Sequence, residues 1–237
     1  MIHIDKLVKS FDENIAVNIS SLSIDNGEIL GIVGNNGAGK TTFFRLLLDL
    51  ICADSGKVTF KDKNVAESEE WKTYTGSFID NSFLIECLRS EEYFAFIGNV
   101  YQLTESEIKE RLARYVDFMN GEILGQKKYI QDFSAGNKQK IGIIGAMFIN
   151  PQVLILDEPF NFLDPSSQIE IKRLLQWMNH EYGTTILISS HNLNHITDVS
   201  TRILLMEKGL ILKDIDNSNM EALSELEVYF KTTPTSE

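Results

Sequence analysis

The sequence predicts an α/β fold, and three stretches carry that prediction. "EILGIVG" is a short apolar strand that runs into the glycine loop "GNNGAGKTT" and then into the helical "FFRLLLDL". "VLILDEP" and "TTILISS" are apolar strands of the fully buried kind, separated by the helical "SSQIEIKRLLQWMNHEYG". Buried strands alternating with helices are typical of a core built on a parallel sheet.

The two ends of the chain and its middle depart from this alternation. Near the N-terminus, residues 2–4 and 15–19 alternate apolar and polar side chains as half-buried strands do, with the turn-like "DENI" between them. "ADSGKVTFKDKNV" predicts a further strand between two turns, and "RILLMEKGLILK" a hairpin that turns near Gly209. "MEALSELEVYF" predicts a closing amphipathic helix.

The middle section, residues 81–139, is predicted to be helical. Thr104 and Glu107 have the spacing of a capping box, and the helix that follows is expected to place one set of side chains on a single face. That set is Ile108, Leu112, Tyr115, Val116 and Met119. In "FSAGNKQK", Ser134 is expected to cap a helix whose apolar run includes Ile141, Ile144 and Phe148.

Composition and charge limit the possible functions. The 237 residues, 43% of them hydrophobic, suffice for one good core. A formal net charge of −12 argues against a broad nucleic-acid surface, which needs clustered Lys and Arg. Cys52 and Cys87 lie far apart, which fits a reducing compartment. With neither a signal peptide nor a run of about 20 apolar residues, a soluble, cytoplasmic protein is expected.

The glycine loop matches the phosphate-binding pattern GxxxxGK[ST]. The match falls at Gly34, Gly39, Lys40 and Thr41, with a strand before it and a helix after it. Backbone N–H groups of such a loop turn toward phosphate oxygens at a helix N-terminus, which already favours anions. Lys40 is expected to reach the β- and γ-phosphates and the Thr41 hydroxyl to bind Mg²⁺; the alternative is a glycine turn with a solvated lysine.

Two acids follow the next buried strand. Asp157 and Glu158 come directly after "VLIL", where open parallel sheets bind their ligands. Asp157 is suited to hold Mg²⁺ through water, and Glu158 to accept a proton from an attacking water. Two adjacent acids after an apolar strand are, taken alone, about as often the start of a loop as a catalytic site. Their occurrence together with the phosphate loop favours the catalytic site.

Two histidines follow the strand "TTILISS". His191 stands directly after it, a position suited to a side chain that contacts a γ-phosphate. His195 stands four residues on, but no HExxH glutamate or third ligand accompanies the pair, so a helix-face residue is favoured over a zinc ligand.

The order of these motifs resembles the ATP-binding cassette (ABC) ATPases, the nucleotide-binding subunits of ABC transporters. The resemblance runs from "LVKSFDENIAV" through "GNNGAGKTT", "FSAGNKQKIGI", "VLILDEPFNFLDP" and "LISSH" to "LLMEKGLI", which is nearly the whole chain. It implies a P-loop NTPase core with an antiparallel β subdomain and an inserted helical subdomain. In residues, the implied single domain comprises a core with its β subdomain at 1–80 and 140–214, a helical subdomain at 81–139, and a C-terminal helix and tail at 215–237.

The resemblance also implies roles for individual residues. Phe11 matches the aromatic residue that stacks on adenine, with an ordinary edge-strand aromatic as the alternative. Ser134 and Gly136 match the signature motif, Asp157 the magnesium acid, Glu158 the catalytic base and His191 the switch histidine. Residues 161–164, which end at Asp164, match the loop that couples two sites. The nucleotide-binding loop itself comprises Gly34, Asn35, Asn36, Gly37, Ala38, Gly39, Lys40, Thr41 and Thr42.

Two positions depart from the family pattern. The usual signature LSGGQ is Phe133 to Asn137 here, and the Ala135 methyl narrows the approach of a phosphate to the backbone. In "YTGSFIDNSFL", Asp80 stands where the family supplies a glutamine to Mg²⁺. Asp80 is therefore a third candidate metal ligand beside Thr41 and Asp157, with a loop residue that makes no metal contact as the alternative.

In this family two cassettes face each other head to tail, and each ATP lies between the phosphate loop of one and the signature of the other. The resemblance therefore implies an ATPase that uses ATP and Mg²⁺, a second ABC subunit of the same or another kind, and a separate membrane permease. It also implies a place at the inner face of the cell membrane. "FSAGNKQK" is most similar to subunits of bacterial exporters. The alternatives are a non-transport ABC ATPase and a low-turnover, ATP-gated regulatory subunit.

Overall fold

Two sheets form the framework of the computed structural model, which describes residues 1–219 and 222–232. The first is a four-stranded antiparallel sheet, in the order β2 (Asn14–Ile24), β1 (Ile2–Phe11), β4 (Ser55–Phe60), β5 (Lys63–Asn64). The second has six strands, in the order β10 (Leu210–Asp216), β9 (Arg202–Glu207), β3 (Ile29–Val33), β8 (Thr185–Ser190), β7 (Val153–Leu156), β6 (Thr75–Phe78). All its neighbouring strands pair in parallel except β9 and β10, which form the predicted hairpin.

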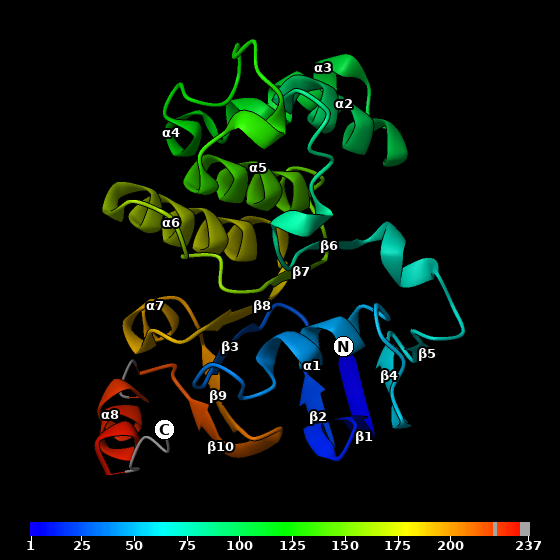
Figure 1. The fold of residues 1–237 in the computed structure, drawn as a ribbon, viewed down its shortest axis with the longest axis vertical. Coiled ribbons are helices and arrows are strands. Elements are labelled where there is room, and N and C mark those ends of the chain that lie inside the picture. Colours follow the sequence, from blue (N-terminus) through cyan, green and yellow to red (C-terminus); the bar gives the residue numbers. More distant parts are fainter. Residues whose placement is uncertain (220–221, 233–237) are drawn as a thin grey trace.

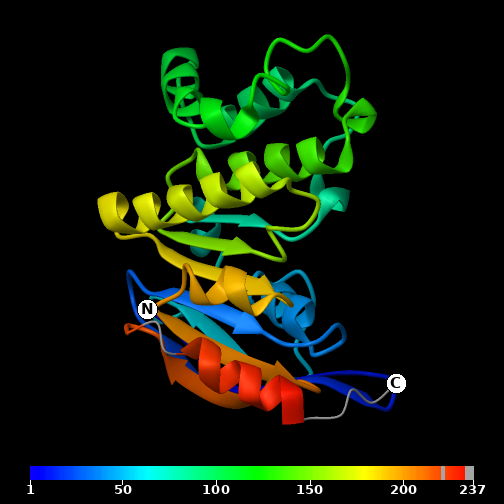
Figure 2. The ribbon, with the colours of Figure 1, turned by 90° about the vertical axis from the view of Figure 1, so that its left-hand side faces the viewer.

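The helices gather mainly on one side of the six-stranded sheet. They are α1 (Lys40–Leu47), α2 (Ser90–Val100), α3 (Glu105–Ala113), α4 (Val116–Met119), α5 (Ala135–Met147), α6 (Pro165–Tyr182), α7 (Leu193–Thr197) and α8 (Ala222–Thr232). Short 3-10 turns span Glu70–Thr73, Asn81–Phe83 and Ile130–Asp132. Figure 1 shows α2, α3 and α4 at one end of the molecule, with α5 and α6 between them and the sheet. In Figure 2, turned by 90°, α8 lies at the opposite end.

Two hydrophobic cores occupy the two faces of the six-stranded sheet. Strand β3 contributes to both, because its side chains alternate: Ile29 and Val33 join the core under α5 and α6, while Leu30 and Ile32 join the core shared with α1 and the four-stranded sheet. All four are buried. The sequence showed the same feature as an apolar run without polar alternation, as expected for a strand covered on both faces.

In the middle section, residues 81–139, the predicted helix caps are present, but one predicted helix is interrupted. Thr104 and Glu107 form the predicted capping box, and Ser134 caps α5 by accepting a hydrogen bond from the Asn137 N–H. The expected single helical face through residue 119 is wrong. Tyr115 leaves helical geometry at φ −105° and ψ 12°, and it separates α3 from α4. Its ring is buried, whereas Val116 turns outward and is 54% exposed.

The predicted segmentation of the chain can be placed on this fold. Residues 81–139 contain α2, α3, α4 and the first turn of α5, and their description as a separate subdomain stays a prediction. The predicted closing helix is present as α8, while residues 220–221 and 233–237 of the predicted C-terminal segment lie outside the described residues. Within the described part, no helix is long and apolar enough to cross a bilayer. Cys52 and Cys87 are exposed free thiols.

Candidate nucleotide site

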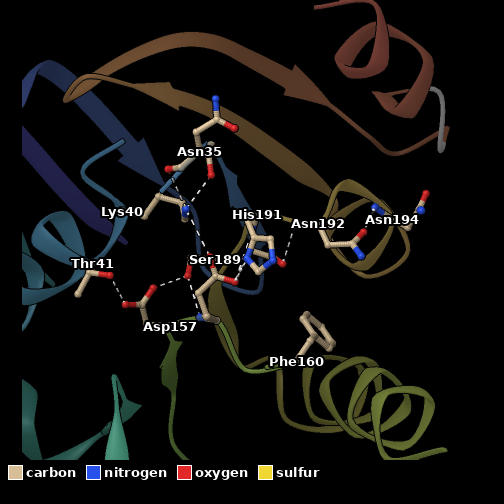
Figure 3. A network of polar contacts seen from close by, with 12 residues as sticks. Asn35, Lys40, Thr41, Asp157, Phe160, Ser189, His191, Asn192 and Asn194 are labelled. Carbon is tan, nitrogen blue, oxygen red and sulfur yellow. Dashed lines mark hydrogen bonds and ion pairs between the residues drawn. The ribbon is translucent and has the colours of Figure 1, made fainter. Parts of the chain in front are cut away.

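Strand register brings the predicted site residues to one edge of the six-stranded sheet. Val33 pairs with Ser190 in β3 and β8, and Leu156 pairs with Ile188 in β7 and β8. Because these strands are parallel, the segments that follow them all begin at the same edge. Figure 3 shows Lys40 and Thr41 of the phosphate loop close to Asp157 and His191, although more than 100 residues separate the loop from the other two. Glu158 joins them through contacts with Lys40 and His191.

The loop from Gly34 to Thr42 has the backbone that its glycines allow. Gly37 and Gly39 adopt positive φ of 81° and 105°, and Gly39 is the N-cap of α1. A Cβ on Gly34 would lie 2.2 Å from the carbonyl oxygen of Met206 in β9, so a side chain there has no room. A pocket of about 200 Å³ opens here, lined by Ala16, Asn36, Gly37, Ala38, Gly39, Lys40, Thr41, Thr42 and Glu158.

Lys40 lies buried inside this loop with its charge balanced by nearby oxygens. Its ammonium donates to the carbonyl of Gly34 at 2.7 Å and to that of Asn35 at 3.4 Å. A carboxylate oxygen of Glu158 lies 3.4 Å from the same nitrogen. A buried ammonium needs such partners, and a bound phosphate can take the place of the carbonyls.

Thr41 and Asp157 supply two oxygens suited to a magnesium ion. The Thr41 hydroxyl donates to Asp157 Oδ2 at 2.5 Å, and Ser189 donates to the other carboxylate oxygen. Burial is the main influence on the pKa of Asp157 and raises it above its ordinary value, against the hydrogen bonds from Ser189 and Thr41. Mg²⁺ prefers a few protein oxygens together with phosphate oxygens, so this pair fits the ion.

Glu158 is held from several sides in a strained backbone conformation. Its φ is 46°, which is uncommon outside glycine and concentrates at functional sites. Its N–H donates to Ser189 Oγ at 2.9 Å, and Gln139 donates to its carbonyl at 3.2 Å. One carboxylate oxygen faces Lys40, and the other lies 2.9 Å from Nδ1 of the exposed His191. This carboxylate is thus fixed between the phosphate loop and the predicted switch histidine.

Ser189 and Gln139 were not among the predicted site residues. Both are fully or nearly buried polar side chains, and both contact Glu158. The available signal for Ser189 was its position directly after the apolar "ILI", near the end of the strand that leads to His191. Gln139 had no comparable signal, because only the packing of α5 against the loop after β7 brings it there.

The signature residues lie next to the loop that ends at Asp164. A Cβ on Gly136 would lie 2.6 Å from the carbonyl oxygen of Phe162. Asp164 caps α6, and hydrogen bonds from Ser166 and Ser167 hold its pKa well below the ordinary value. Ser134 is exposed, and its hydroxyl accepts from its own helix at 3.3 Å. Capping is therefore one role of "FSAGNKQK", and phosphate contact stays a prediction.

Asp80 binds protein groups on both carboxylate oxygens. Oδ1 accepts from the Ser82 N–H at 2.8 Å, and Oδ2 lies 3.3 Å from the Arg45 guanidinium in α1. Burial alone raises the pKa of Asp80, but the hydrogen bonds from Ser82 and Arg45 outweigh it and lower the pKa. Ser82 and Arg45 thus stabilise the negative charge of an aspartate at this position. Metal contact by Asp80 stays a prediction.

Phe11 and His195 are the two remaining residues that the sequence singled out. Phe11 ends β1 and is 50% exposed, so its ring is available to a ligand. His195 lies on α7 and stacks on Phe160 at 4.5 Å between ring centroids, and burial lowers its pKa. In the part of the chain that the structure describes, no cluster of three or more His, Cys, Asp or Glu side chains could hold a metal.

Comparison with known proteins gives the same family as the motifs. The family model described as ABC transporter matches residues 17–161. The bacitracin transport ATP-binding protein BcrA of Enterococcus faecalis is 32% identical over 93% of this chain and 70% of its own length. The methionine import ATP-binding protein MetN 2 of Bacillus cereus is 31% identical over 90% of this chain and 64% of its own. The chain thus spans about two thirds of each of these relatives.

Among solved structures, cbiO1 from Clostridium perfringens, described as part of the ABC transporter complex cbiONQ, superposes with a TM-score of 0.77. The identity is 27%, and the match covers 99% of this chain and 95% of that one. Motifs, fold and relatives agree, and the chain belongs to the ABC transporter family, with the fold of its ATP-hydrolysing, ATP-binding subunits.

Proposed function

We propose that this chain is the Mg²⁺-dependent ATPase of a transporter, and that it acts with a second cassette and a separate permease. The observation that carries the proposal is the position of Glu158, whose two carboxylate oxygens face Lys40 and His191 at the mouth of the phosphate loop. A carboxylate fixed beside a phosphate site is placed to accept the proton of an attacking water.

Each residue of the site then has a defined task. Backbone N–H groups of the loop and the N-terminus of α1 bind the phosphates, and Lys40 exchanges its carbonyl partners for phosphate oxygens. Thr41 and Asp157 hold Mg²⁺, which neutralises charge on the phosphates when it is bound. The Ser189 hydroxyl orients the carboxylate of Asp157 by donating to it, and fixes the backbone of Glu158 by accepting from its N–H.

The exposed signature supports the proposal of a second cassette. Ser134 and Phe162 face solvent, although Gly136 packs against the backbone of Phe162. In a head-to-tail dimer these surfaces would close over the partner's γ-phosphate, with Ser134 and the N-terminus of the 13-residue α5 as donors. ATP then stabilises the closed dimer, and hydrolysis releases it.

A permease is the proposed second partner. Phe96 and Val100, one turn apart on α2, are at least half exposed, and Phe83 in the 3-10 turn Asn81–Phe83 is also half exposed. We assign these apolar side chains to the contact with the permease. The description of cbiO1 as part of a transporter complex supports the same assembly. We place the chain at the inner face of the membrane and assign it to an exporter because of its signature segment, although relatives named for import also match.

The experiment compares the wild type with Glu158→Gln. The amide keeps the shape of the side chain but is not a base, so turnover should fall by about 10²- to 10⁴-fold. ATP binding should remain, and ATP should now retain the protein as a dimer in size-exclusion chromatography. Lys40→Ala is the control that should lose ATP binding itself. Wild-type turnover in Glu158→Gln would remove Glu158 from the mechanism, and low turnover in the wild type with its permease would favour a regulatory subunit.

A further inference from the structure

The hairpin of β1 and β2, which carries Phe11, packs against the phosphate loop at a β-bulge. Lys9 pairs with Val17 and Ser10 with Ile15, so Ala16 is the extra residue on β2. Ala16 lines the pocket of the phosphate loop, and its carbonyl oxygen lies 2.3 Å from where a Cβ on Gly39 would be. Phe11 pairs with Asn14, so it lies across from a residue that is two positions along β2 from Ala16.

A second attachment comes from Asp54, in the loop before β4. Its carboxylate accepts from the Lys9 ammonium at 2.7 Å and from the Ser10 N–H at 2.6 Å. Its own N–H donates to the carbonyl of Val8 at 2.9 Å. Asp54 thus binds three consecutive residues of β1, immediately before Phe11. The hydrogen bond from Lys9 is the main cause that lowers the pKa of Asp54, so this carboxylate is charged at neutral pH.

Lys9 also contacts the Phe11 ring. Its ammonium lies 5.5 Å from the ring centroid, within the range of a cation–π contact. The Lys9 side chain is only 17% exposed, whereas Phe11 is 50% exposed. After Phe11 the chain turns through Asp12 at a φ of 51°. The ammonium occupies one side of the ring and leaves the rest of it open to a ligand.

We propose that Lys9 and Asp54 are positioning residues for the base of the nucleotide: Asp54 fixes Lys9, and Lys9 holds the Phe11 ring in the orientation that stacks on adenine. This inference rests on the proposed function, in which the pocket binds ATP and Phe11 contacts its base. A ligand without a base does not need the ring. The pair should therefore affect ATP binding and leave the binding of a bare polyphosphate unchanged.

The test measures dissociation constants by calorimetry for Mg-ATP and for Mg-tripolyphosphate. Lys9→Met keeps the length of the side chain without its charge, and Asp54→Asn keeps the shape of the carboxylate. Each should weaken ATP binding by about 2- to 5-fold, the loss of one cation–π contact, and should leave tripolyphosphate binding unchanged. Lys9→Arg keeps the charge and should restore ATP binding. Melting temperatures identify any variant that fails to fold.

Phe11→Ala separates this inference from the function on which it rests. The loss of a base–aromatic stack should weaken ATP binding by about 5- to 150-fold and leave tripolyphosphate binding unchanged. Suppose that Phe11→Ala weakens the binding of ATP alone, while Lys9→Met and Asp54→Asn change the binding of both ligands equally or of neither. The positioning role of Lys9 and Asp54 is then overturned, and the contact between Phe11 and adenine stands. If Phe11→Ala itself is not selective, the adenine contact fails and the inference fails with it.

Discussion

Ser189→Ala should damage both the stability and the activity of the protein, because one hydroxyl serves two buried groups. It donates to Asp157 and accepts from the Glu158 N–H at 2.9 Å, and Ser189 itself is fully buried. A buried polar group that loses its partner costs about 1–3 kcal/mol. With two such groups affected, we expect the free energy of unfolding to fall by roughly 2–4 kcal/mol.

The matched control is Ser200→Ala. Ser200 is also buried, but its hydroxyl has no hydrogen-bond partner among the described residues. Removing it should be neutral or slightly stabilising. Denaturant unfolding of both variants and the wild type gives the comparison, and equal losses from Ser189→Ala and Ser200→Ala would refute the reasoning. Mg²⁺-dependent turnover should fall by about 10- to 100-fold in Ser189→Ala alone, as is usual for groups that orient a metal ligand.

The loss in Ser189→Ala should also depend on pH. Burial already raises the pKa of Asp157 in the folded state, and the Ser189 hydrogen bond opposes that rise. Without Ser189 the folded pKa rises further, so the charged carboxylate is the form that the substitution penalises. The destabilisation should be complete above this folded pKa and should shrink as the pH falls through it. A loss of stability that is the same at acidic and neutral pH would contradict this assignment.

Two further substitutions test single side chains. Asp80→Gln restores the family's usual residue and removes the ion pair with Arg45. If Asp80 reaches the metal, the Mg²⁺ concentration that gives half-maximal turnover should change. An identical Mg²⁺ titration in both proteins would leave Asp80 as a loop residue without metal contact. Tyr115→Phe removes a buried hydroxyl that has no hydrogen-bond partner in the described part of the chain, so the melting temperature should hold or rise, whereas a clear fall would show that this hydroxyl is bonded in solution.

The predictable part of this molecule is the part that local patterns determine. The phosphate loop needed only its glycines, the strand before it and the helix after it. "VLIL" showed its burial by having no polar position, and "TTILISS" showed it by the apolar run "ILI" at its centre. Parallel pairing then brought their ends together at one edge, as the general rule for such sheets predicts.

The parts that were not predicted depend on contacts between distant segments. Val116 continued a helical pattern in the sequence, but the helix is interrupted at Tyr115, whose ring is buried, and Val116 begins α4 with an exposed side chain. The partners of Asp80 are a neighbouring serine and an arginine on α1, and the alignment of motifs gave no sign of the arginine. Ser189 and Gln139 became site residues only through the register of β7 with β8 and the docking of α5.

The central claim, that each ATP is shared between two chains, is tested most directly with mixed dimers whose chains carry different tags. Lys40→Ala disables the phosphate loop, and Ser134→Arg blocks the signature. If sites are shared, the two changes on opposite chains fall in one site and leave the other able to occlude ATP, whereas both changes on one chain spoil both sites. We predict occluded ATP in purified dimers of the first kind and none in the second. Occlusion retained only when both changes lie on one chain would contradict the shared site.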